Sequence, residues 1–133
     1  MANSQPWDYY PLFPIYAFTD IRKARNKVKK ITGRRYEPSG KQGSFTEYEH
    51  DGGSLRFGII YLDCDDETAS HKYAVLAHEC VHYAQAFEET VTKARLDDET
   101  FAYVMQCAML SCIDQIGGEW FNETQQTSKS SEG

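Results

Sequence analysis

The chain reads Ala-His-Glu-Cys-Val-His-Tyr over residues 77–83, and this stretch contains the pattern HExxH. An α-helix turns by about 100° per residue, so His78 and His82 lie one turn apart on one face, where both imidazoles can bind one ion. The carboxylate of Glu79 can reach a water molecule on that ion and act as its general base. Chance alone would produce the pattern in about one such chain in a hundred. The residues around it therefore have to be consistent with a metal site.

The surrounding sequence predicts a long helix from about Ser70 to about Glu88. Apolar side chains recur there at helical spacing and form a broad surface, as expected of a helix that lies between a sheet and another helix. They are Tyr73, Leu76, Ala77, Cys80, Val81, Ala84 and Phe87. We therefore expect the motif to lie on a largely buried central helix.

A second long helix is predicted to begin at Asp97 or Asp98, either of which can cap it, and to end at Gly117-Gly118. Its predicted buried stripe consists of Phe101, Met105, Ala108, Met109, Cys112, Ile113 and Ile116. Two long helices joined by a short connection favour antiparallel packing. The start of the second helix would then lie near the end of the first.

The first half of the chain predicts a short strand, a helix and a β-hairpin. The strand covers 15–18, and the helix covers 21–31, between Thr19 or Asp20 as its N-cap and Gly33 as its end. The runs 45–50 and 54–62 are rich in aromatic and β-branched residues and are separated by Asp-Gly-Gly, which is typical of a hairpin. In the second run Leu55, Phe57, Ile59 and Tyr61 share one face, and Ile60 and Leu62 share the other.

A catalytic zinc site usually has three protein ligands, so the two histidines require a partner. Glu99 follows His82 by 17 residues and lies in the first turn of the second helix, where antiparallel packing would bring it within reach. Asp98 competes with it, and His50 or His71 are further alternatives. A site without a third protein ligand is the remaining alternative. Glu99 is the favoured ligand because the small Ala102 on its face would let the two helices approach closely.

The HExxH motif, followed by Glu-Thr-Phe-Ala-Tyr over 99–103, resembles the gluzincin branch of the zincin metallopeptidases. It resembles more narrowly the small phage and prophage HExxH proteins, over residues 14–116. The resemblance implies an α+β fold with the element order β-α-β-β-α-α, in which a small, mostly antiparallel sheet packs on the two long C-terminal helices. It also implies Zn²⁺ held by His78, His82 and Glu99, and a zinc-bound water that Glu79 activates to cleave a peptide or protein substrate.

A tetrahedral intermediate needs stabilisation beyond the metal. Tyr103, one turn after Glu99, is the first candidate, although it could equally be a residue that packs the helix. His50, His71, Tyr73 and Tyr83 are weaker candidates. An exposed edge strand commonly aligns the substrate in zincins, and the hairpin of residues 45–62 is expected to supply one.

A chain of 133 residues with 41% hydrophobic and 14% aromatic content is expected to form one folded domain. We place that domain at 14–121, between an extended, aromatic and proline-rich arm at 1–13 and a disordered tail at 122–133. Three of the four cysteines fall at apolar positions of predicted helices or directly after a strand, and the cysteines are expected to be reduced. No basic region precedes an apolar run, so we expect a cytoplasmic protein without membrane insertion.

The net charge of −6 argues against general nucleic-acid binding, but eight of the 14 Lys and Arg residues fall within 22–35. The basic face of the helix at 21–31 is either a solvated surface or a docking surface for an acidic partner or nucleic acid. The latter would fit an alternative function, a zinc-containing but catalytically silent binding or inhibitor protein. Oligomeric state is not determined by any of these patterns.

Overall fold

The computed structural model describes residues 13–50 and 56–122. Apart from Phe13, the predicted N-terminal arm lies outside the described residues, as do residues 123–133 of the predicted tail. Phe13 itself has no exposed surface and belongs to the hydrophobic core. Asn122 is exposed and ends a short helical segment that begins at Gly118.

The described strands form one three-stranded mixed sheet in the order β1-β3-β2. β1 (Ile15–Phe18) pairs with β3 (Arg56–Leu62) in parallel, and β2 (Gly43–Glu49) pairs with β3 in antiparallel orientation. The hairpin is therefore confirmed, whereas the expectation of a mostly antiparallel sheet is only half right. β2 starts at the end of the sheet where β1 finishes, since Phe18 and Ser44 are both paired with Tyr61. β2 therefore runs opposite to β1, and β3, which is antiparallel to β2, runs parallel to β1.

β3 is the central strand and is buried on both faces, as its nearly continuous apolar run predicts. Phe57, Ile59 and Tyr61 pack in one hydrophobic cluster, and Ile60 and Leu62 pack in the other. The predicted division of these side chains between two faces is therefore confirmed, except for Leu55, which lies outside the described residues.

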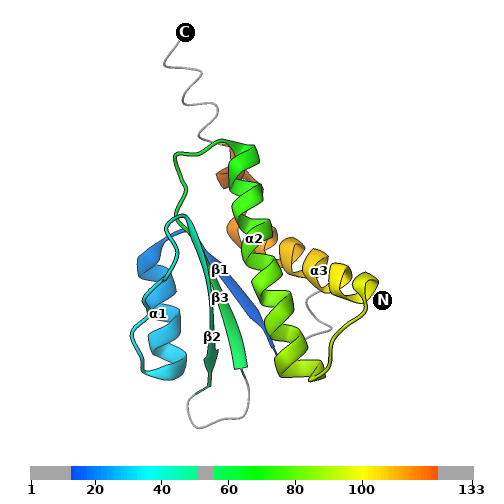
Figure 1. The fold of residues 1–133 in the computed structure, drawn as a ribbon. Coiled ribbons are helices and arrows are strands. Elements are labelled where there is room, and N and C mark those ends of the chain that lie inside the picture. The colour runs from blue at the N-terminus through cyan, green and yellow to red at the C-terminus, as the bar shows by residue number, and fades with distance from the viewer. Residues whose placement is uncertain (1–12, 51–55, 123–133) are drawn as a thin grey trace, which may run out of the picture.

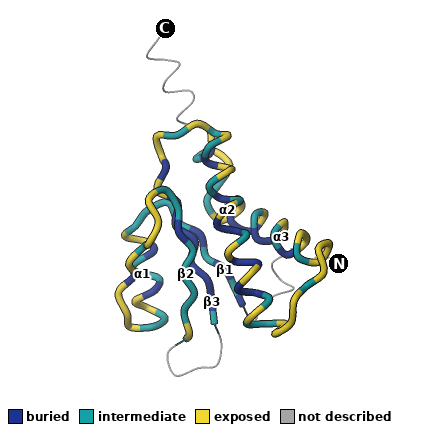
Figure 2. The backbone as a smooth tube through the Cα atoms, viewed as in Figure 1, coloured by how far each residue is buried: buried dark blue, intermediate teal, exposed yellow. Residues whose placement is uncertain are grey.

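α1 (Ile21–Thr32) covers the first of these faces (Figure 1). The Asp20 side chain accepts a hydrogen bond from the Arg22 N–H at its start, and this contact lowers the pKa of Asp20. Gly33 ends the helix in the left-handed conformation, with φ of 75°. Ala24 and Val28 are buried against the sheet. The other side of the helix is exposed (Figure 2) and carries Arg22, Lys23, Lys29 and Lys30.

The other face of the sheet is covered by α2 (Ala69–Phe87) and α3 (Asp98–Ile116), which are joined through a π-helical turn, η2 (Glu88–Thr92). Asp97 caps α3, as predicted, and Thr68 caps α2. The fully buried residues of α3 are Val104, Cys107, Ala108, Ser111 and Cys112. The predicted stripe is therefore rotated slightly, and Phe101, Met105, Met109, Ile113 and Ile116 are only partly buried at its border.

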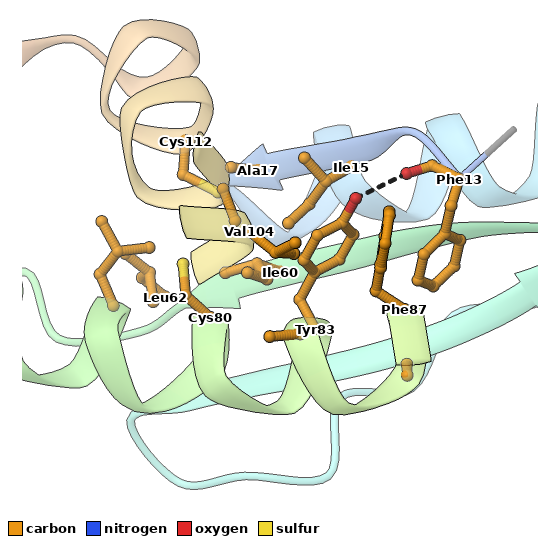
Figure 3. Close-up of a cluster of buried hydrophobic side chains, with 14 of the residues drawn as sticks. Phe13, Ile15, Ala17, Ile60, Leu62, Cys80, Tyr83, Phe87, Val104 and Cys112 are labelled. Carbon is orange, nitrogen blue, oxygen red and sulfur yellow. Dashed lines mark hydrogen bonds between the residues drawn. The ribbon is translucent and has the colours of Figure 1, made fainter. Parts of the chain in front are cut away.

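The core between the sheet and these helices is drawn in Figure 3. Tyr83 stacks on Phe13, with ring centroids 5.0 Å apart, and its hydroxyl donates a hydrogen bond of 2.8 Å to the Phe13 carbonyl. All four cysteines are buried free thiols, as expected. None of the helices within the described ranges is sufficiently long and apolar to cross a membrane.

Candidate metal centre and its cleft

His78 and His82 project from one face of α2, one turn apart, as the motif predicts. Their Nε2 atoms are 3.3 Å apart, and the two rings meet edge to face with centroids separated by 4.9 Å. Both side chains are exposed, so their Nε2 atoms can be reached from solvent. The pair is therefore organised to present two nitrogen atoms to one ligand.

This spacing fits a tetrahedral metal ion. Two nitrogen ligands at the usual zinc distance of about 2.0–2.1 Å, separated by a tetrahedral angle, are about 3.3–3.4 Å apart. The observed 3.3 Å between Nε2 atoms matches that value. A direct hydrogen bond between a protonated and an unprotonated imidazole nitrogen would have a similar length, so the distance fits both interpretations.

Glu79 lies beside the histidine pair and points toward the sheet. Its side chain is only 6% exposed, and burial raises its pKa, an effect opposed by positive charge on His78 and His82. β2 approaches this residue at Gly43, where an added Cβ atom would lie 3.0 Å from Glu79 Oε2. The absence of a side chain at Gly43 therefore permits the close approach of strand and carboxylate.

A cleft of about 470 Å³ runs between this face of α2 and β2. It is lined by Ser39, Gly40, Gly43, Ser44, Phe45, His78, Glu79, His82, Gln85, Ala86 and Glu89. β2 is an edge strand of the sheet, as expected for the strand that would align a substrate. The candidate catalytic groups and this edge strand thus form the two walls of one cleft.

The opposite edge of the sheet is blocked. The side chain of Gln115, on α3, accepts a hydrogen bond from the Ala17 N–H and donates one to the Ile15 carbonyl, each 2.9 Å long. Its amide therefore occupies hydrogen-bonding groups of β1 that a further strand would need. An added extended chain would accordingly find β2, beside the histidine pair, the more accessible edge.

The predicted residues of α3 are exposed and are not assembled with the histidine pair. Asp98 and Glu99 lie in the exposed first turn of α3, and Tyr103 is 51% exposed. α3 crosses α2 obliquely in Figure 1 and contacts it through Cys80 and Cys112. Cys80 lies about 160° around the helix from His82, so the side of α2 that contacts α3 is nearly opposite the side that carries His82. Residues 13–50 and 56–122 contain no group of three His, Cys, Asp or Glu side chains placed to hold a metal. The roles of Glu99 and Tyr103 stay predictions.

The weaker alternatives have other contacts. His50 packs edge to face on Phe57, Tyr73 stacks on Phe121, and Tyr83 binds the Phe13 carbonyl. His71 Nε2 is 2.6 Å from the side-chain oxygen of Gln42, which lines a smaller pocket next to His78 and Glu79.

Sequence reasoning missed three residues that line the cleft beyond His82, namely Gln85, Ala86 and Glu89. They follow His82 by three, four and seven residues, which is the spacing of one helix face. Extending the face of the histidine pair along α2 would have found them. Gly43 had no comparable signal, because its importance depends on how closely a strand approaches a helix.

Comparisons with protein-family models, with curated proteins and with solved structures found no match to this chain.

Proposed function

We propose that this protein is a zinc-dependent metallopeptidase that hydrolyses peptide or protein substrates bound along β2. The observation that carries the proposal is the combination of His78 and His82 Nε2 atoms 3.3 Å apart with a buried carboxylate, Glu79, in the same cleft. A purely structural metal site has no need of that carboxylate.

His78 and His82 would hold the ion as neutral imidazoles. A bound zinc ion would supply a water molecule of lowered pKa and polarise the scissile carbonyl. Glu79 would accept the proton from that water and pass it to the departing amine. Burial raises the pKa of Glu79, which makes its carboxylate a better proton acceptor. Glu99 is the proposed third ligand and Tyr103 the proposed oxyanion donor, and both roles require the start of α3 to approach the histidine pair.

β2 would bind the substrate through its backbone. An extended peptide that adds to a sheet edge satisfies the unpaired N–H and C=O groups of that edge, while pockets beside it select side chains. The Gln115 amide covers groups on the β1 edge, so β2 is the edge left for such pairing. The scissile bond would then lie between β2 and the histidine pair.

The test is cleavage of a broad peptide library by protein prepared without chelator and supplied with zinc. We expect cleavage by the parent protein, none after chelation, and a loss of about 10²–10⁴-fold with Glu79→Gln, which removes the proton acceptor. Glu119→Gln, an exposed change on the C-terminal helical segment, is the matched control. Absence of cleavage across the library, in protein shown to contain zinc, would reject the peptidase proposal.

A second candidate function is a zinc-containing binding or inhibitor protein that docks through α1. It is favoured by the basic residues on the solvent side of that helix, among them Lys23, Lys29 and Lys30, which are all exposed. Zinc binding without cleavage, together with salt-sensitive capture of an acidic protein that Lys29→Glu abolishes, would favour this function over the first.

A further inference from the structure

The cleft continues past the histidine pair to Glu89, at the start of η2. Glu89 lines the cleft and is exposed. It follows His82 by seven residues, which is about 10 Å along a helix. Gln85 and Ala86 lie between them on the same wall. Glu89 therefore places a carboxylate near the far end of the proposed substrate site.

Arg56 on β3, opposite this end of β2, is already paired with acidic side chains. Arg56 binds the carboxylates of both Glu47 and Glu49. Thr90 donates a hydrogen bond of 2.8 Å to Glu47, which attaches η2 to the end of the strand. Glu88, the neighbour of Glu89, accepts a hydrogen bond from the Leu96 N–H. No ion pair or hydrogen bond of Glu89 is found within the described ranges, so its charge is free to interact with a ligand.

Two carboxylates line the cleft beside the histidine pair. Among the described residues that line it there is no Lys or Arg, whereas Glu79 and Glu89 are both acidic. Its volume of about 470 Å³ is large enough to hold a long side chain. A cleft with this charge and shape favours a peptide that carries a basic residue.

The direction of β2 relative to α2 specifies where in the peptide that residue would be. Along β2, Gly43 lies against Val75 and Glu79, Phe45 packs on Tyr83, and Glu47 binds Thr90. Strand and helix therefore run in the same direction. A peptide that pairs with β2 in the more stable antiparallel orientation runs the opposite way, so its residues before the scissile bond approach Glu89.

The distance between His82 and Glu89 indicates which residue of the substrate Glu89 would contact. An extended chain rises about 3.3 Å per residue, so the roughly 10 Å between His82 and Glu89 corresponds to about three residues. A glutamate side chain on a helix leans toward the helix N-terminus, which shortens that distance. The contact therefore falls two or three residues before the scissile bond.

We propose that Glu89 selects substrates with an Arg or Lys two or three residues before the scissile bond, an inference that rests on the proposed peptidase function. Arg is favoured over Lys because its planar guanidinium can bind a carboxylate through two hydrogen bonds. An ion pair at an exposed carboxylate changes affinity by up to about fivefold. Glu89 thus acts on specificity and takes no part in the proton transfer.

The cleavage experiment uses zinc-loaded protein and peptides that differ only at that position, with Arg, Gln or Glu. We expect the parent protein to cleave the Arg peptide about three- to fivefold faster, in kcat/KM, than the Gln peptide. Glu89→Gln should remove this preference and Glu89→Lys should reverse it in favour of Glu. Glu119→Gln, the matched control, should leave the preference unchanged.

A binding experiment separates this inference from the proposed peptidase function. Glu79→Gln protein is titrated with the same fluorescent peptides, and the affinities are measured by anisotropy. Preferential binding of the Arg peptide that is lost in Glu79→Gln/Glu89→Gln supports the selection by Glu89, even where the parent protein cleaves nothing and the peptidase proposal fails.

Three results would overturn the inference. The first is equal cleavage or binding of the three peptides by protein with Glu89 intact. The second is an Arg preference that survives Glu89→Gln. The third is a loss of zinc from Glu89→Gln, because Glu89 would then be a metal ligand. Absence of both cleavage and binding rejects the inference together with the peptidase function.

Discussion

The close approach of β2 to α2 at Gly43 can be tested with Gly43→Ala. The added Cβ atom would lie 2.6 Å from Val75 Cγ1 and 3.0 Å from Glu79 Oε2, and both distances are too short for unaltered packing. The backbone at Gly43 does not have positive φ, so alanine itself is not strained there. The expected effect is therefore a local displacement of the Val75 and Glu79 side chains, or of the strand.

Overpacking of this kind usually lowers the free energy of unfolding by about 1–3 kcal/mol. Replacing glycine by alanine raises it by about 0.4–1 kcal/mol, because alanine restricts the unfolded chain. We expect the free energy of unfolding to fall by about 1–2 kcal/mol and Tm to fall by about 3–8 °C. Urea denaturation and thermal unfolding of the metal-free protein measure both quantities. Cleavage activity should fall as well, because Glu79 is displaced.

Val75→Ala removes the atom responsible for the shortest contact. The double variant Gly43→Ala/Val75→Ala should therefore be more stable than the sum of the single changes predicts, by about 1 kcal/mol. Gly118→Ala is the control, since an added Cβ atom there has no neighbour within 4 Å. An unchanged Tm for Gly43→Ala, with no coupling to Val75, would refute the close approach of strand and helix.

Three further predictions concern the metal, the blocked sheet edge and pH. Glu99→Ala should reduce zinc content from about one ion per chain, measured by elemental analysis, and full occupancy would contradict its proposed role as third ligand. Gln115→Ala removes the two hydrogen bonds to β1 and should lower the free energy of unfolding in urea by about 1–2 kcal/mol, whereas no change would show that the Gln115 amide contributes nothing to the sheet edge. Burial raises the pKa of Tyr36 from 10.0 to about 12, so the folded protein keeps a proton that the unfolded chain releases. The stability of the protein should therefore decline as pH rises from about 10 toward 12, and Tyr36→Phe, followed by urea midpoints across that range, should remove this part of the decline.

Local patterns predicted much of the fold. The helix that carries the motif was expected at about 70–88 and covers Ala69–Phe87, and the strand expected at 15–18 is observed at the same residues. These features depend on the side-chain period and on capping by residues close in the chain, both of which can be recognised in one sequence. The spacing of His78 and His82 is of the same kind, because it is a property of a single helix.

Other features depend on how the elements pack. The π-helical turn at Glu88–Thr92 and the oblique crossing of α3 over α2 have no short-range signal in the sequence. The parallel pairing of β1 with β3 depends on a return of the chain after α1 that no local periodicity specifies. The sequence was therefore informative about each element but not about the angle between α2 and α3.

The sequence by itself determined the two imidazoles and the carboxylate at 78, 79 and 82, since i, i+1 and i+4 positions on a helix fix their relative directions. Only the tertiary structure decided what lies opposite them. The edge strand β2, which approaches α2 closely at Gly43, faces the histidine pair. The reason is that a helix pattern specifies which side is buried, whereas the element that covers each side depends on packing between residues distant in the chain.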